Sequence, residues 1–160
     1  MRIAGSIITA ICGIVVVVSV FLTWLDMSYS GYGYSFSCGA TGLNLLKGSV
    51  TCMGYTSDIG TATQPWLILG GGIVMTLFAI PAFIVSLAAK GGKAAIITLS
   101  IFAILGALVA IGGGIWTFID VGGDGLSFLA YGFYIGFAAA VVGFIFAILT
   151  AAFSKGKQDW

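Results

Sequence analysis

Four apolar stretches without a charged side chain constrain this chain more than any other feature. They cover residues 3–25, 65–89, 94–119 and 131–153. A helix rises about 1.5 Å per residue, so roughly 20 apolar residues cross a hydrocarbon core of about 30 Å. Each of the four stretches meets that length. The sequence therefore predicts an all-α integral membrane protein, a single domain over residues 1–160 built as a four-transmembrane-helix bundle.

Composition excludes several functional classes. The 160 residues are 60% hydrophobic and 7% charged, with a mean hydropathy of +1.18, whereas a soluble domain carries about 25% charged residues. A net charge of +1 from six cations offers no basic patch, so we expect no nucleic-acid partner. The chain has no His and no Glu, which removes the commonest acid–base residues and metal ligands. We expect no catalytic residues, no cofactor and no metal, and hence no enzyme.

The distribution of charge predicts an orientation. Five cations fall on one side of the four stretches: Arg2, Lys90, Lys93, Lys155 and Lys157. The other side holds Lys47 with four of the five Asp residues. By the positive-inside rule, we expect a multi-pass protein of the cell membrane with both termini cytoplasmic and with residues 26–64 and 120–130 outside. The first stretch is too long for a signal peptide, so we expect it to be retained.

Aromatic residues at the outer ends of the four stretches support this orientation. Such rings favour the membrane–water interface. We expect five of them there: Trp24, Trp66, Trp116, Tyr131 and Tyr134.

The first outer loop is long enough to form structure of its own. Large and small residues alternate over 32–38, which is typical of a strand, and residues 50–56 form a second candidate. Between them, residues 41–48 suit a short helical turn, because Thr41 can cap its start and Gly48 can follow its end.

The cysteines indicate how this loop is stabilised. Cys38 and Cys52 both lie in it, one in each candidate strand, whereas Cys12 lies within the first span. A disulfide that staples a small extracellular β element is the simplest interpretation of an external pair. A redox-active dithiol, or free or intermolecular cysteines, are the alternatives.

The second outer loop, residues 120–125, suggests a calcium site because it combines two carboxylates with glycines. Two carboxylates supply too few ligands, and the EF-hand spacing is absent. We therefore favour an ordinary solvated turn.

Small residues recur along the fourth span at steps of three or four. This strip predicts a helix-packing interface, either with a helix of the same bundle or with another subunit. Glycine triplets at 70–72 and 112–114 either pack helices tightly or soften them around a cavity. The strip consists of Gly132, Gly136, Ala140, Gly143 and Ala147.

The layout resembles the claudin-like tetraspan group, with four helices, cytoplasmic termini and a two-cysteine first outer loop. Claudins carry a Trp, then Gly-Leu-Trp, then a cysteine pair in that loop. This chain has Trp24, but Gly42 and Leu43 are followed by Asn44 and lie between the cysteines, so the claudin motif is not matched. The chain also resembles uncharacterised prokaryotic four-helix membrane proteins with an aromatic and glycine-rich fourth span. Both resemblances imply an architecture and a membrane location.

These observations favour a non-catalytic structural or interaction protein that either self-associates or serves as an accessory subunit of a larger membrane complex. Its expected partners are membrane lipid and other copies of the chain or other membrane-protein subunits. Aromatic side chains of the outer loop suit partner contacts. A passive channel or carrier for a small or apolar solute is the alternative. The expected contact residues are Tyr32, Tyr34, Phe36 and Tyr55.

Overall fold

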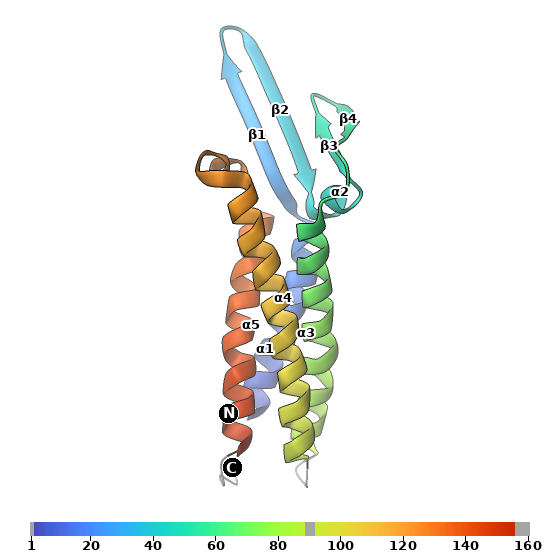
Figure 1. Cartoon of the computed structure of the whole chain (residues 1–160), viewed down its shortest axis with the longest axis vertical. Helices are drawn as coiled ribbons and strands as arrows, with labels where there is room; N and C mark the ends of the chain where they lie inside the picture. Colours follow the sequence, from blue (N-terminus) through green and yellow to red (C-terminus); the bar gives the residue numbers. More distant parts are fainter. Residues whose placement is uncertain (1, 89–91, 156–160) are drawn as a thin grey trace.

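The computed structural model describes residues 2–88 and 92–155. Four helices form an elongated bundle with a β-sheet at one end and both ends of the chain at the other (Figure 1). The four helices are α1 Arg2–Ser19, α3 Thr63–Leu87, α4 Lys93–Gly125 and α5 Tyr131–Lys155. Lys90 and Lys157, which contribute to the predicted orientation, lie outside the described residues.

Three of the described helices are long and apolar enough to cross a membrane. They span Thr63–Leu87, Lys93–Gly123 and Tyr131–Ser154, while Ile3–Ser19 is a shorter apolar helix. Three such helices indicate a multi-pass membrane protein. Large apolar side chains are exposed on all four helices, which is the distribution expected where lipid replaces water.

Besides the helices, the chain forms a four-stranded antiparallel sheet between α1 and α3. Its strands are ordered β1-β2-β3-β4, and the short helix α2 Gly42–Leu46 separates β2 from β3. The sheet is larger than the small element that the sequence predicts. The strands are β1 Thr23–Gly31, β2 Tyr34–Thr41, β3 Ser49–Cys52 and β4 Tyr55–Asp58.

The predicted helical turn is confirmed. The Thr41 hydroxyl accepts a hydrogen bond from the Asn44 N–H at 3.1 Å, which caps the start of α2. Gly48 follows the end of α2 with φ +74°. A Cβ at Gly48 would also lie 2.6 Å from the Gly60 carbonyl carbon, so this position requires glycine for two reasons.

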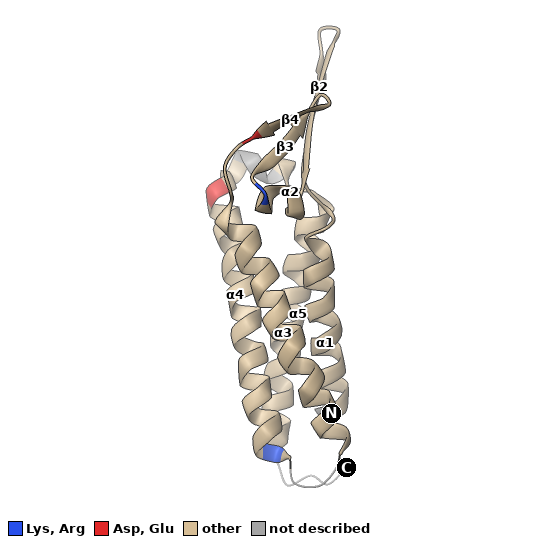
Figure 2. Cartoon of the chain, turned by 90° about the vertical axis from the view of Figure 1, so that its right-hand side faces the viewer, with Lys and Arg blue, Asp and Glu red and all other residues tan. Residues whose placement is uncertain are grey.

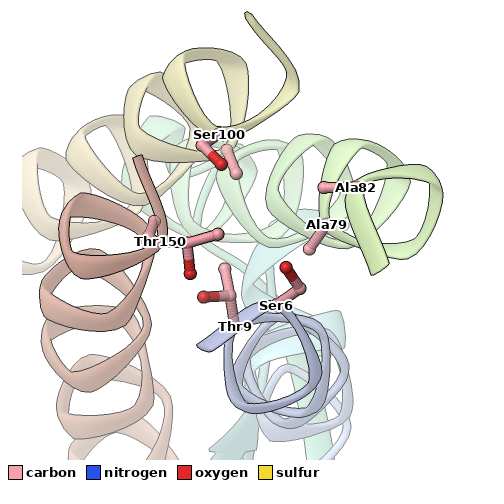
Figure 3. A pocket seen from close by; sticks show the side chains of 8 residues that line it. Ser6, Thr9, Ala79, Ala82, Ser100 and Thr150 are labelled. Carbon is pink, nitrogen blue, oxygen red and sulfur yellow. The ribbon is translucent and has the colours of Figure 1, made fainter. Parts of the chain in front are cut away.

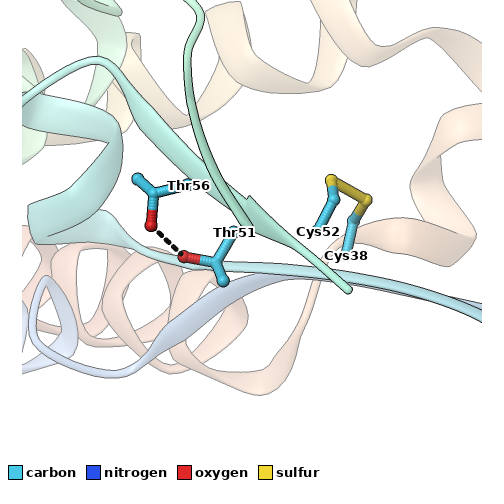
Figure 4. Close-up of a disulfide and its surroundings, with 4 residues drawn as sticks. All are labelled: Cys38, Thr51, Cys52 and Thr56. Atoms are coloured by element: carbon cyan, nitrogen blue, oxygen red, sulfur yellow. Dashed lines mark hydrogen bonds between the residues drawn. A yellow bond between two sulfur atoms is a disulfide. The ribbon is translucent and has the colours of Figure 1, made fainter. Parts of the chain in front are cut away.

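The predicted disulfide is confirmed as well. Cys38 of β2 and Cys52 of β3 are register partners and form a disulfide with Cα atoms 4.1 Å apart (Figure 4). On the neighbouring pair of strands, the hydroxyls of Thr51 and Thr56 lie 3.4 Å apart. The disulfide therefore joins the long β1–β2 hairpin to the short β3–β4 hairpin.

The helix expected over residues 3–25 is wrong at its C-terminal end. Helix α1 stops at Ser19, and β1 begins at Thr23. The carbonyls at the end of α1 and just after it have partners outside the helix: the Trp24 indole N–H donates to the Ser19 carbonyl at 2.7 Å, and the Leu43 N–H donates to the Val20 carbonyl at 2.8 Å.

Trp24 consequently does not belong to the expected ring of interfacial aromatics. It is 2% exposed and packs edge-on against Phe133 of α5, with ring centroids 5.6 Å apart. The other four expected residues, Trp66, Trp116, Tyr131 and Tyr134, are exposed near the sheet end.

The loop expected over residues 120–130 is mostly helical. Helix α4 continues to Gly125, with an interruption at Gly122, where φ is +70°, and a short 3-10 helix follows at Leu126–Phe128. Val121 packs against the core, and the Asp120 carboxylate accepts a hydrogen bond from the Gln64 side-chain amide of α3. These two contacts hold the last turns of α4 against the bundle.

Candidate functional site

The β1–β2 hairpin has two chemically different faces. Register partners project side chains to the same face of a sheet, and successive residues alternate between faces. One face carries the pairs Tyr29–Phe36 and Gly31–Tyr34, and the opposite face carries Ser28–Ser37 and Ser30–Ser35. The Tyr29 ring lies over Gly31, since its hydroxyl is 2.9 Å from where a Cβ at Gly31 would be.

The aromatic face continues a face that is buried at the base of the hairpin. Leu25 and Ala40 are partners there and belong to the core or pack against it. Next along the strands come Met27 and the disulfide residue Cys38. Figure 1 shows the hairpin rising beyond the helix ends, where the described chain no longer covers it.

The predicted contact residues lie at this projecting part of the sheet. We call the aromatic side chains of Tyr29, Tyr34, Phe36 and Tyr55 the aromatic surface; their exposed fractions are 65%, 83%, 45% and 80%. Tyr55 is the register partner of Cys52 and therefore shares the face of the disulfide.

Tyr32 lies at the tip rather than in a strand. It is 99% exposed and forms a two-residue turn with Gly33, with φ of +51° and +82°. Met53 and Gly54 repeat this turn between β3 and β4. Positive φ at both positions is typical of tight hairpins, so a residue followed by Gly inside an alternating segment is the signal that locates both turns.

A cleft lies beneath the sheet, between α3 and α4. It has a volume of about 290 Å³ and is the feature that the sequence did not reveal. Its polar residues are Gln64, Thr117 and Asp120, and the Thr117 hydroxyl donates to the Gly113 carbonyl within its own helix. Its apolar walls are formed by Trp24, Leu25, Leu45, Pro65, Val121 and Leu129.

A smaller cavity lies on the bundle axis toward the opposite end. Hydroxyls of Ser6, Thr9, Ser100 and Thr150 and four alanines line it, and Figure 3 shows these side chains converging from all four helices. Its volume is about 10 Å³, which suits about one water molecule. The Thr9 and Thr150 hydroxyls donate to carbonyls of their own helices, those of Gly5 and Phe146.

The small-residue strip of α5 faces the inside of the same chain. A Cβ at Gly132 would lie 2.6 Å from the Thr23 carbonyl oxygen, and Gly136 contacts Ser19. A Cβ at Gly143 would lie 3.0 Å from the Cys12 Cβ and 2.8 Å from the Met75 methyl group. Ala140 and Ala147, at intermediate positions, are buried.

The alternative of a calcium site over residues 120–125, which the sequence disfavours, concerns residues that the structure describes in part. The side chain of Asp124 lies outside the described residues, and Asp120 is bonded to Gln64. Among the residues that were described, no group of three or more His, Cys, Asp or Glu side chains is placed to hold a metal ion.

Comparison with known proteins gave no relatives: no protein-family model matches the chain, and no curated protein matches it. The structure itself shows apolar helices with a disulfide-linked four-stranded sheet between α1 and α3.

Proposed function

We propose that this chain is a non-catalytic interaction protein of the cell membrane. Its helices anchor it, and the aromatic surface binds a protein partner, either a second copy of the chain or another subunit of a larger membrane complex. The observation that carries the proposal is the segregation of aromatic and serine side chains onto opposite faces of a hairpin that projects beyond the bundle.

The size of the aromatic surface suits binding. At about 200 Å² for each aromatic side chain, the exposed fractions amount to on the order of 500 Å². Exposed apolar patches of a few hundred Å² are often functional. Tyrosines supply large, rigid contact area, and they are enriched among the residues that dominate binding energies. Residues 27–38 carry no charged side chain, so the free-energy cost of removing water from this face is low.

A four-span topology supports this use of the hairpin. Helix α1 is about 27 Å long, close to the hydrocarbon thickness, and it packs along α3 and α5. Lys93 is the first residue of α4, which starts at the end opposite the sheet, whereas Lys47 follows α2, Asp58 ends β4 and Asp120 lies in the last turns of α4 (Figure 2). The positive-inside rule then places both termini in the cytoplasm and the sheet outside.

The interior of the bundle favours an interaction protein over a pore. Val16, Met75 and Ala107 are completely buried between the helices. The axial cavity described above has a volume of only about 10 Å³, whereas a conducting path through the described helices would require a continuous polar lumen.

The proposal is tested by photo-crosslinking in native membranes. We expect p-benzoylphenylalanine in place of Phe36 to form a protein adduct on irradiation, because this position lies within the aromatic surface. The matched control replaces Ser35, one residue away on the serine face, and should give little adduct. The mass of the adduct and the peptides obtained from it identify the partner. An adduct of twice the chain mass indicates self-association, and peptides from another protein indicate a complex with that protein.

Two results would overturn the proposal. If Phe36 and Ser35 positions crosslink equally, the two faces do not differ in binding. If the Phe36 position yields only lipid adducts, the hairpin contacts membrane instead of protein.

Topology is tested by cysteine labelling in intact cells. We expect Ser57→Cys to react with a membrane-impermeant maleimide, and Ala94→Cys to react only after permeabilisation. Both positions are exposed, Cys12 is buried, and Cys38 and Cys52 are oxidised, so the background is low. Labelling of both variants in intact cells would contradict the proposed topology.

A further inference from the structure

We propose that the cleft beneath the sheet binds a small amphiphile with an apolar body and a positively charged head. The inference concerns a different site from the aromatic surface and does not depend on what the hairpin binds.

The shape and lining of the cleft set the class of ligand. Side chains of β1, α2, α3 and α4 line it, and Leu25, Leu45 and Leu129 supply apolar wall from three separate segments. A volume of about 290 Å³ accommodates on the order of ten non-hydrogen atoms. Mostly apolar walls with a few polar groups at one place are the usual composition of a ligand site.

The polar groups of the cleft favour a cation. Asp120 is the one charged residue among the described residues of the lining, and the hydrogen bond from Gln64 orients its carboxylate. Thr117 is already bonded to its own helix, so the unused hydrogen-bonding capacity is chiefly that of an acceptor. An ammonium group supplies hydrogen-bond donors and a positive charge that complement the Asp120 carboxylate. Such charge-assisted hydrogen bonds are stronger than hydrogen bonds between neutral groups.

The surroundings of the cleft reinforce this preference. Among the described residues at the sheet end, Lys47 is the one cation, it is exposed, and it is not part of the lining. Asp26 of β1 and Asp58 of β4 add negative charge at the same end, which attracts cations toward the cleft.

The position of the cleft explains why the ligand would be amphiphilic. Trp66 directly follows Pro65 and Trp116 directly precedes Thr117, and both tryptophans are about half exposed on the outside of the bundle. Tryptophan marks the level of the membrane–water interface. The cleft therefore lies where an amphiphile places its head in the polar layer and its apolar body in a less polar one.

The test uses a photoreactive octylamine, with a diazirine in its chain, and the full-length protein in phosphatidylcholine nanodiscs. We expect labelling to map to the segments that line the cleft and to be displaced by octylammonium, more weakly by octanol, and not by octyl sulfate. Asp120→Asn keeps an acceptor for Gln64 but removes the charge, and it should raise the half-saturating octylammonium concentration about tenfold.

Two further variants separate binding from folding. Asp58→Asn makes the same change in charge outside the cleft and should shift half-saturation by less than about twofold. Ala62→Phe fills the cleft from the residue before α3 and should abolish labelling while the thermal midpoint is kept. Equal losses in Asp120→Asn and Asp58→Asn, or equal displacement by octanol and octylammonium, would overturn the proposal.

The origin of the amine is decided by lipid composition. If phosphatidylethanolamine in the nanodisc displaces the label, the site takes an amine lipid from the bilayer. If it does not, while octylammonium still competes, the site takes a soluble amphiphilic amine. Either result supports the cation site.

Discussion

Replacing Gly71 by Leu should lower the thermal midpoint of the detergent-solubilised protein by roughly 10 °C, corresponding to about 3 kcal/mol. A Cβ at Gly71 would lie 2.5 Å from the Gly106 carbonyl oxygen and 2.6 Å from the Ala110 backbone nitrogen. These are backbone atoms of α4, which cannot rotate away, so α3 and α4 would have to separate.

The neighbouring glycine supplies a matched control. Gly70 belongs to the same triplet, but a Cβ there meets nothing within 4 Å. We expect Gly70→Leu to keep the thermal midpoint within a few degrees, because the new side chain points away from the described helices. Thermal unfolding followed by intrinsic fluorescence compares the two variants directly. Similar midpoints for both would show that the backbones of α3 and α4 do not approach each other at Gly71.

The second large effect is expected for Gly136→Leu, which should lower stability by about 1–3 kcal/mol at any protein concentration. A Cβ at Gly136 would lie 3.0 Å from the Ser19 Cβ and would contact the Ser19 hydroxyl. That hydroxyl donates to the Val16 carbonyl at 2.6 Å, and the Ser19 carbonyl accepts from Trp24. Displacing Ser19 therefore disturbs the end of α1 and the base of the hairpin together.

Two readouts distinguish the possible roles of the small-residue strip. Val142→Leu, on the exposed side of α5, should be tolerated. Size-exclusion chromatography with light scattering, run beside thermal unfolding, reports assembly. A Gly136→Leu variant that keeps its thermal midpoint but changes from an oligomer to a monomer would show that the strip is a lateral interface between copies.

Hydropathy and local turn chemistry were sufficient to predict a large part of this fold. The three long apolar helices follow from runs of uncharged residues, because a segment of that composition is stable only where its backbone is bonded internally and its side chains avoid water. The turn at Thr41–Gly48 follows from a cap and a left-handed position, both properties of single residues. The Cys38–Cys52 disulfide follows from two cysteines in one loop.

The sequence could not predict which glycines of the two triplets pack against a neighbouring helix. Gly71 and Gly70 are chemically identical neighbours, yet the first meets backbone atoms of α4 and the second meets nothing. The rotation of α3 about its axis decides which of the two glycines faces α4, and that rotation depends on how all the helices pack together. The cleft is likewise a product of five segments that meet only in the folded chain.

By itself, then, the sequence determined which segments are apolar helices, where the short turn forms and which cysteines pair, since each depends on residues close together in the chain or on composition. The tertiary structure alone decided that α1 ends at Ser19 and that β1 begins at Thr23, within the stretch expected to be helical. The reason is that a continuous run of apolar residues contains no local signal for the residue at which its helix ends. Here the Ser19 carbonyl accepts a hydrogen bond from the Trp24 indole and the Val20 carbonyl accepts one from the Leu43 N–H, and only the folded chain brings Leu43 to this place.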